Sequence, residues 1–189
     1  MRLSALLYQR VLRRVFDLLL LVPALPILLP LIFLLAVMIR IDSPGPAFLR
    51  LTRRGRDGVP FRQFRFRCVW MDAPMRAFKA TAVTPDDPRL TRMGAFALRT
   101  RLNTLPMIFN VLAGSMSLVG PRALPLRVDG IEPEVLRLVS QLRPGIFTPD
   151  GADQGGVDER ARNAAGLAWL RRAGPLRDLR IVLRGVTGI

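Results

Sequence analysis

The sequence contains no histidine, a single cysteine and a single lysine, and the first two scarcities each exclude a class of chemistry. Without histidine, imidazole acid–base catalysis and histidine-ligated metal sites are excluded. A lone Cys68 cannot form an intramolecular disulfide, and it fits a reducing compartment as a small half-buried side chain. Any catalysis by side chains must therefore use carboxylates.

Acidic residues are also few, since 14 Asp and Glu stand against 29 Lys and Arg for a formal net charge of +15. Lys79 is the only lysine, so the excess is almost entirely arginine. A planar guanidinium pairs with phosphate oxygens at two points, and the balance favours lipid head groups, nucleotide diphosphates or nucleic acid as partners. At 189 residues, the chain has room for one domain plus a membrane element.

The largest apolar run covers residues 18–39, which are 22 consecutive residues without a charge. As a helix, this run is long enough to cross a bilayer core. Pro23, Pro26 and Pro30 lie inside it and should bend or break the helix, because each removes a backbone donor. Arginines flank both ends, and cationic flanks prefer the cytoplasm. The pattern therefore favours a re-entrant membrane helix over a straight span, with both ends on the cytoplasmic face.

The remaining sequence predicts an α+β protein, with a membrane-anchoring helix over residues 1–41 and a small, mainly helical cytoplasmic domain over 42–189. Two strands, 47–51 and 61–69, should form a short β-hairpin, because Asp57-Gly58 between them is a turn signal. Helical spacing covers 90–112, where Pro106 can start a new helix. Further helices are expected over 135–142, 164–172 and 176–183, and residues 143–157 are expected to be a loop.

One string combines a turn with a cation, namely Ser115-Met116-Ser117-Leu118-Val119-Gly120-Pro121-Arg122. Gly120 and Pro121 favour a turn that fixes the Arg122 guanidinium, which is then able to clamp a phosphate. From this string alone, an ordinary surface arginine is the simpler interpretation.

Several further segments, in the same order, give the chain its resemblance to a known family. They are Arg13-Arg14-Val15-Phe16-Asp17, Asp42-Ser43-Pro44-Gly45-Pro46, Arg53-Arg54-Gly55-Arg56-Asp57-Gly58, residues 61–67, residues 87–94, Leu105-Pro106, Asn110-Val111-Leu112, residues 117–122 and Arg143-Pro144-Gly145-Ile146. With these segments the chain resembles the bacterial sugar transferases that act as polyprenyl-phosphate phosphoglycosyl transferases, over most of its length.

The resemblance implies a monotopic protein of the bacterial inner membrane with a re-entrant helix. It also implies a reaction in which a sugar phosphate passes from a nucleotide sugar to polyprenyl phosphate, with magnesium, at the start of surface or exopolysaccharide assembly. In the family, an adjacent Asp-Glu pair within Leu-Asp-Glu-Leu-Pro carries the chemistry, and a carboxylate attacks phosphorus to form an acyl-phosphate intermediate.

This sequence departs from the family pattern at the pair itself, which reads Leu102-Asn103-Thr104-Leu105-Pro106. Asn103 has nearly the shape of Asp without an anionic oxygen, and Thr104 cannot replace Glu as a hard anionic metal ligand. Leu98 also stands where the family often has Arg. The sequence therefore predicts impaired or absent catalysis and makes a bound magnesium ion doubtful.

Other residues bear on the same question. Asp86-Asp87 and Asp158-Glu159 are adjacent acidic pairs that a rearranged mechanism would have to use, although such pairs usually start helices or turns. The predicted phosphate-binding residues are Arg122, Arg99, Arg65 and Arg67, with Arg89 and Arg92 retained nearby. The same arginines would also suit anionic lipid.

Three hypotheses follow from these patterns. In the first, the chain is a divergent sugar transferase with little or no activity that binds polyprenyl phosphate and a nucleotide sugar. In the second, it is an active phosphoglycosyl transferase with rearranged catalytic residues. In the third, it is a basic peripheral protein that binds lipid or nucleic acid; the ordered motifs argue against this, and no nucleic-acid partner is expected.

Overall fold

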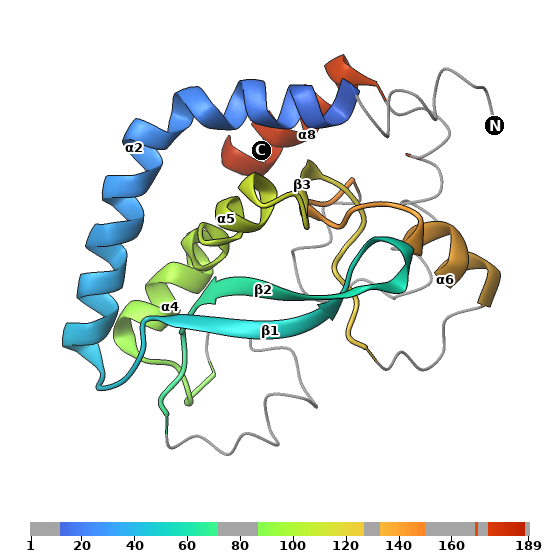
Figure 1. Ribbon diagram of the computed structural model, residues 1–189. Coiled ribbons are helices and arrows are strands. Elements are labelled where there is room, and N and C mark those ends of the chain that lie inside the picture. Colours follow the sequence, from blue (N-terminus) through green and yellow to red (C-terminus); the bar gives the residue numbers. More distant parts are fainter. Residues whose placement is uncertain (1–11, 72–86, 127–132, 150–168, 170–173, 188–189) are drawn as a thin grey trace. The chain divides into compact units, whose positions relative to one another are not determined.

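The computed structural model describes residues 12–71, 87–126, 133–149, 169 and 174–187 (Figure 1). Over these residues the protein is α+β, as predicted, with a long apolar helix at the N-terminal end. The chain divides into two compact units. The first unit comprises Met1–Pro23, Thr52–Arg62 and Ile108–Ile189, and the second comprises Ala24–Leu51 and Gln63–Met107. This division is not sequential, and the predicted domain boundary at residue 41 stays a prediction.

The N-terminal helix α2 runs from Arg13 to Asp42 and is long and apolar enough to cross a membrane. It continues through Pro23, Pro26 and Pro30, so the expected break in secondary structure does not occur. These prolines are three and four residues apart and all are exposed, which places the lost donors on one outer face of the helix. Asp42 ends the helix, and its carboxylate accepts a hydrogen bond from the Met93 backbone N–H.

The predicted β-hairpin is present as β1 (Phe48–Arg54) and β2 (Pro60–Phe66). A short 3-10 turn, η2 (Arg56–Gly58), joins the strands. Within it Asp57 has a φ of 57° and Gly58 a φ of 78°, which is the left-handed region that Asp tolerates and Gly adopts without strain. The turn predicted from Asp57-Gly58 is therefore confirmed.

A second pair of strands was not predicted. β3 (Ser117–Val119) pairs in parallel with β4 (Gly145–Phe147), with Ser117 opposite Gly145 and Val119 opposite Phe147. β4 lies within residues 143–157, which were expected to be loop. Its three residues are too few to give an alternating pattern, and their Pro and Gly neighbours hide them in the sequence.

The remaining helices match the predicted positions closely. The stretch 90–112 divides into α4 (Arg92–Arg99), the 3-10 turn η3 (Leu102–Thr104) and α5 (Met107–Leu112), which begins directly after Pro106. α6 (Pro133–Ser140) and α8 (Pro175–Thr187) correspond to the helices expected over 135–142 and 176–183. Apart from Trp169, the helix expected over 164–172 lies outside the described residues.

Candidate functional site

The positions of the family's acidic pair lie in the second unit, in the 3-10 turn η3. Asn103 is buried, and the Thr104 hydroxyl donates a hydrogen bond of 2.8 Å to the Arg101 carbonyl oxygen. Arg101 precedes the turn with a φ of 59°, a left-handed conformation that is costly for a side chain of this size. The Thr104 hydroxyl thus closes a local turn, and neither side chain carries a negative charge.

These residues do not fit a magnesium ion. Magnesium is bound in proteins mainly through carboxylate oxygens, whereas Asn103 and Thr104 offer an amide and a hydroxyl that already has a partner. Among the residues that the structure describes, no three His, Cys, Asp or Glu side chains come together in a group able to hold a metal.

Asp87, one of the candidate substitute nucleophiles, is engaged by a neighbouring arginine. Its carboxylate accepts hydrogen bonds from the Arg89 backbone N–H at 3.0 Å and from Arg89 Nε at 2.8 Å, and it also pairs with Arg89 Nη2. These contacts lower the pKa of Asp87 to about 2. The carboxylate is therefore ionised but held in a local turn. Asp86, Asp158 and Glu159 lie outside the described residues.

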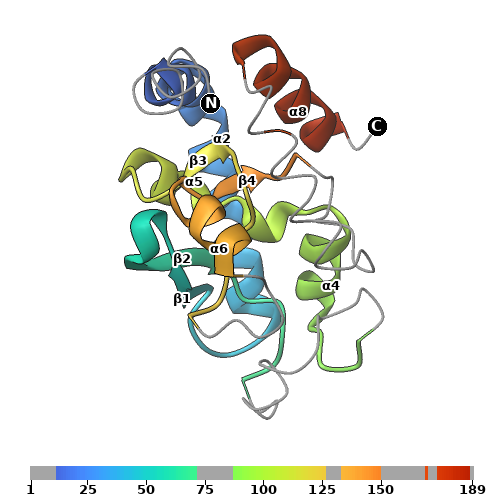
Figure 2. The same cartoon turned by 90° about the vertical axis from the view of Figure 1, so that its right-hand side faces the viewer.

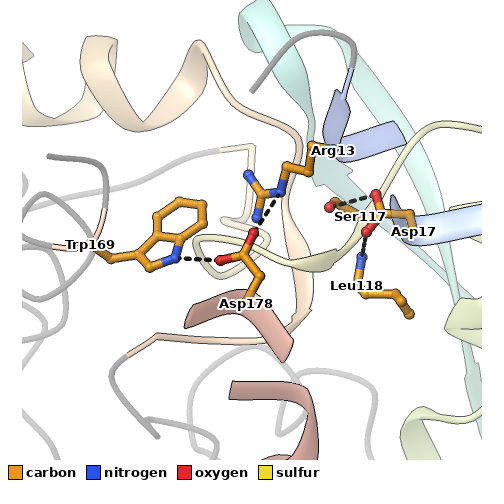
Figure 3. A network of polar contacts seen from close by, with 6 residues as sticks. All are labelled: Arg13, Asp17, Ser117, Leu118, Trp169 and Asp178. Atoms are coloured by element: carbon orange, nitrogen blue, oxygen red, sulfur yellow. Dashed lines mark hydrogen bonds and ion pairs between the residues drawn. The ribbon is translucent and has the colours of Figure 1, made fainter. Parts of the chain in front are cut away.

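The other described carboxylates also have structural partners. Asp57 forms an ion pair with Arg56 at the exposed end of the hairpin, at 3.3 Å. Asp42 accepts from the start of α4, as described above. Asp17 and Asp178 are buried and fully engaged in the contacts of the first unit (Figure 3). Each carboxylate group named here, from Asp17 to Asp178, thus has a partner within the fold.

Arg122 gains a cationic neighbour that the sequence did not reveal. Arg53, on β1, is half-buried, and its Nε has no hydrogen-bond partner in the described structure. Burial, and then the positive charge of exposed Arg122, lower the pKa of Arg53. The Arg54 backbone N–H donates to the Leu124 carbonyl at 2.8 Å, which brings the end of β1 beside the segment after Arg122. Neighbouring guanidinium groups repel each other and favour a bound anion. Arg53 and Arg122 are separated by 69 positions along the chain, so only the fold brings them together.

A close approach of two glycines fixes the turn that presents Arg122. A Cβ on Gly120 would lie 2.6 Å from the Gly145 nitrogen, and a Cβ on Gly145 would lie 2.0 Å from the Gly120 nitrogen. The Gly145 N–H donates to the Pro121 carbonyl at 2.9 Å. Both backbones can approach this closely only because neither residue has a side chain. The turn predicted at Gly120-Pro121 is therefore packed directly against the start of β4.

More cationic groups gather in the same unit around Arg143, the residue before Pro144 and β4. Burial lowers the pKa of Arg143, and the charges of Arg56 and Arg14 lower it further, while Asp17 acts in the opposite direction. The Arg14 guanidinium donates to the carbonyl oxygens of Val111 and Leu112 at the end of α5, the latter at 2.8 Å. The first unit thus combines arginines from the hairpin, the β3 turn and the segment before β4.

The remaining predicted phosphate ligands lie in the second unit. Arg67 is buried and donates to the backbone carbonyls of Ser43, at 2.8 Å, and Pro44. Its guanidinium therefore stabilises the turn after α2. The prediction that Arg67 binds phosphate stays a prediction. Arg99 is exposed at the end of α4, and Arg65 is half-buried near the Cys68 thiol.

A buried contact with Asp17 supports the β3 strand (Figure 3). The Asp17 carboxylate accepts hydrogen bonds from the Ser117 hydroxyl at 2.7 Å and the Leu118 backbone N–H at 3.0 Å. Sequence reasoning missed this role, although a carboxylate at the edge of an apolar run is a signal, because a buried charge needs partners. The start of α2 is thereby joined to the strand that leads to Arg122.

A second buried contact joins α2 to α8. Arg13 Nε lies 3.6 Å from Asp178 Oδ2, and Trp169 Nε1 donates to Asp178 Oδ1 at 3.0 Å (Figure 3). The Arg13 guanidinium also lies over the Trp169 ring, 4.4 Å from its centroid. All three side chains are buried, so the start of α2 and the start of α8 are held together by a specific polar contact.

Comparison with known proteins decides the family. The model of the bacterial sugar transferase family matches residues 8–189. The chain belongs to this family. The exopolysaccharide production protein PSS of Rhizobium leguminosarum bv. phaseoli is 34% identical over 184 residues, which are 91% of this chain and 92% of that protein.

Other relatives carry a specific activity in their names. A UDP-glucose:undecaprenyl-phosphate glucose-1-phosphate transferase of Caulobacter vibrioides is 34% identical over 172 residues, 85% of this chain and 62% of the relative. The protein of the same name in Escherichia coli is 40% identical over 114 residues, 60% of this chain and 24% of the relative. The chain thus spans less than two thirds of the length of these two enzymes.

Proposed function

We propose that this sugar-transferase family member binds phosphate-bearing substrates at a membrane through Arg53 and Arg122 and does not catalyse sugar-phosphate transfer. The binding half of the proposal rests on the pair of guanidiniums in the first unit. Its ligands would be polyprenyl phosphate or a nucleotide sugar of exopolysaccharide synthesis, the classes named for the relatives. The charge pattern suits a phosphate or diphosphate, because two neighbouring guanidinium groups offer several N–H donors and two positive charges.

The non-catalytic half of the proposal rests on Asn103 and Thr104. Attack on phosphorus needs an anionic oxygen, and a metal needs anionic ligands to offset its charge. These two side chains supply neither, and Thr104 uses its hydroxyl to close the turn. The described carboxylates that might replace them are engaged elsewhere, as Asp87 is by Arg89.

The alternative is an active phosphoglycosyl transferase with rearranged catalytic residues. The full-length similarity to a protein named for exopolysaccharide production favours it. It would need a nucleophile, and the first residues to test would be Asp86 and Asp87.

The proposed location is the cytoplasmic face of the bacterial inner membrane, with α2 re-entrant. Both ends of α2 make polar contacts, since Arg14 donates to α5 and Asp42 accepts from α4. The hairpin strands continue from one unit into the other, and each has seven residues. Such a strand extends about 23 Å and carries arginines, so it cannot cross a bilayer core of about 30 Å. Both ends of α2 are therefore expected on the same side of the membrane.

The binding site is tested by calorimetry, which measures the affinity of the purified protein in detergent for a nucleotide sugar. Arg122→Ala and Arg53→Ala should each weaken binding by about 1.5–3 kcal/mol, the value of a hydrogen bond to a charged group. Arg137→Ala, at an exposed position on α6, is the matched control and should leave the affinity unchanged. If the parent protein binds neither a nucleotide sugar nor polyprenyl phosphate, the proposed site does not exist.

A further inference from the structure

The C-terminal helix α8 has an exposed apolar side. Leu176, Leu183 and Val186 are 82%, 55% and 72% exposed. Their spacings of seven and three residues place them on one face of the helix. The opposite face is packed, because Asp178 is buried and a Cβ on Gly185 would collide with the Phe147 ring.

Beside this apolar side, the same helix carries a basic side. Arg177, Arg180 and Arg184 are all exposed, and their spacings of three and four residues align them along the helix. The outward surface of α8 is thus divided lengthwise into an apolar half and an arginine half. This division is typical of helices that lie in the plane of a membrane interface.

The start of α2 presents a similar apolar side. Val15, Leu19 and Val22 are exposed at spacings of four and three residues. The buried contact between Arg13 and Asp178 joins this part of α2 to α8 within the first unit. Figures 1 and 2 show both helices along the same side of this unit, next to each other. Each helix therefore exposes three large apolar side chains on one face.

We infer that α8 lies in the interface of an anionic bilayer, with Leu176, Leu183 and Val186 among the acyl chains and its arginines at the phosphates. The charge selects this occupant, because each arginine near an anionic leaflet is worth about 1 kcal/mol. A second copy of the chain is disfavoured, since two such faces would bring arginines against arginines. α8 is therefore a second membrane contact besides the apolar part of α2.

Depth-dependent fluorescence quenching tests this placement in the full chain. Single cysteines replace Leu176 or Val186 in a Cys68→Ser background, carry an environment-sensitive dye, and are reconstituted in phosphatidylcholine vesicles with phosphatidylglycerol. Thr52→Cys, at an exposed position of β1 in the same unit, is the matched control. The two α8 labels should be quenched about threefold more by lipid-borne shallow nitroxides than the control, and less by aqueous iodide. Quenching equal to the control at both positions would overturn the inference.

A charge variant and a crosslinking measurement distinguish an anionic bilayer from a protein partner at the exposed surface of α8. Arg177→Gln, Arg180→Gln and Arg184→Gln together should reduce the nitroxide quenching of the Val186 label by about twofold or more. The reduction should occur in vesicles with phosphatidylglycerol and not in phosphatidylcholine alone. Disulfide formation between Val186→Cys copies, or burial of the label only when another protein is added, would instead identify a protein partner and overturn the lipid assignment. Neither measurement uses a substrate, so the result for α8 is independent of whether the proposed substrate binding occurs.

Discussion

At the scale of residues, Asn103 and Thr104 keep a local structure while changing its chemistry. The Thr104 hydroxyl donates to the Arg101 carbonyl, and Asn103 is buried, so both side chains fit the turn between α4 and α5. The Thr104 hydroxyl has a partner within the turn, so this polar group does not oppose folding. The sequence alone was sufficient to detect this change, since it concerns the identity of two adjacent side chains.

Other residue roles depend on partners far along the chain and were not predictable. Arg122 was singled out from a turn signal, but its neighbour Arg53 lies in another segment of the sequence. Arg67 was assigned to phosphate for its charge, whereas the fold surrounds it with the carbonyls of Ser43 and Pro44. A cation in a sequence shows only that it needs anionic or carbonyl oxygens, and tertiary structure decides which.

The reactivity of Cys68 provides a prediction at this scale. The thiol is buried, and burial raises its pKa to about 11, although the Arg65 charge acts in the opposite direction. Only the thiolate reacts, so at pH 8 alkylation should be about 100-fold slower in the native protein than in urea. The native rate should rise about tenfold per pH unit up to the pKa. Equal rates in native and unfolded protein, followed by mass spectrometry, would show that Cys68 is accessible and ordinary.

At the scale of elements, local signals succeeded where the structure is local. The hairpin follows from Asp57-Gly58, and α5 begins at the residue after Pro106. The parallel pair β3 and β4 joins segments separated by 25 residues, and its close Gly120–Gly145 contact has no counterpart in a local pattern. The prolines of α2 predicted a bend or a break. The helix is continuous through all three, and their shared exposed face places the missing backbone donors on one side, so no break in secondary structure occurs.

The contact between α2 and β3 predicts a measurable loss of stability. Asp17→Asn retains the shape of the side chain but weakens its hydrogen bonds to Ser117 and Leu118, so it should cost about 1–3 kcal/mol of unfolding free energy. Denaturant titration in detergent measures the loss. Asp57→Asn, at the exposed end of the hairpin, is the control and should cost less than about 0.5 kcal/mol.

A double variant checks that the contact itself is responsible. Asp17→Asn combined with Ser117→Ala should cost less than the two single changes added together, because the residues share one hydrogen bond. Strict additivity would mean that Asp17 and Ser117 act separately, and that β3 is not held by α2 through this contact.

At the scale of the whole molecule, the family and its membrane character were readable from ordered motifs and one apolar run, and the family is confirmed. The grouping of chain segments into two compact units was not readable, because segments of the two units alternate along the sequence. The spacing of apolar residues along the sequence predicts individual helices and strands. The compact units depend instead on contacts between distant residues, such as that of Asp17 with Ser117.

Membrane topology provides a prediction for the molecule as a whole. Cysteines placed at Arg10, before α2, and at Asp57, in the hairpin turn, should both be protected from an impermeant maleimide in intact cells. Both should become labelled in inverted vesicles, because a re-entrant helix returns to the side from which it entered. Cys68→Ser provides the background. Labelling of one site in cells and the other only in vesicles would mean that α2 spans the membrane.

Transfer activity tests the central claim most directly. The purified protein is given magnesium, polyprenyl phosphate and a panel of radiolabelled nucleotide sugars, and labelled lipid is separated and counted. The parent should form none, because Asn103 and Thr104 provide no nucleophile and no anionic metal ligand. Asn103→Asp with Thr104→Glu restores both acids and, relative to the parent, should produce measurable labelled lipid. Sustained turnover by the unmodified chain would contradict the account and would make Asp86 and Asp87 the first residues to replace.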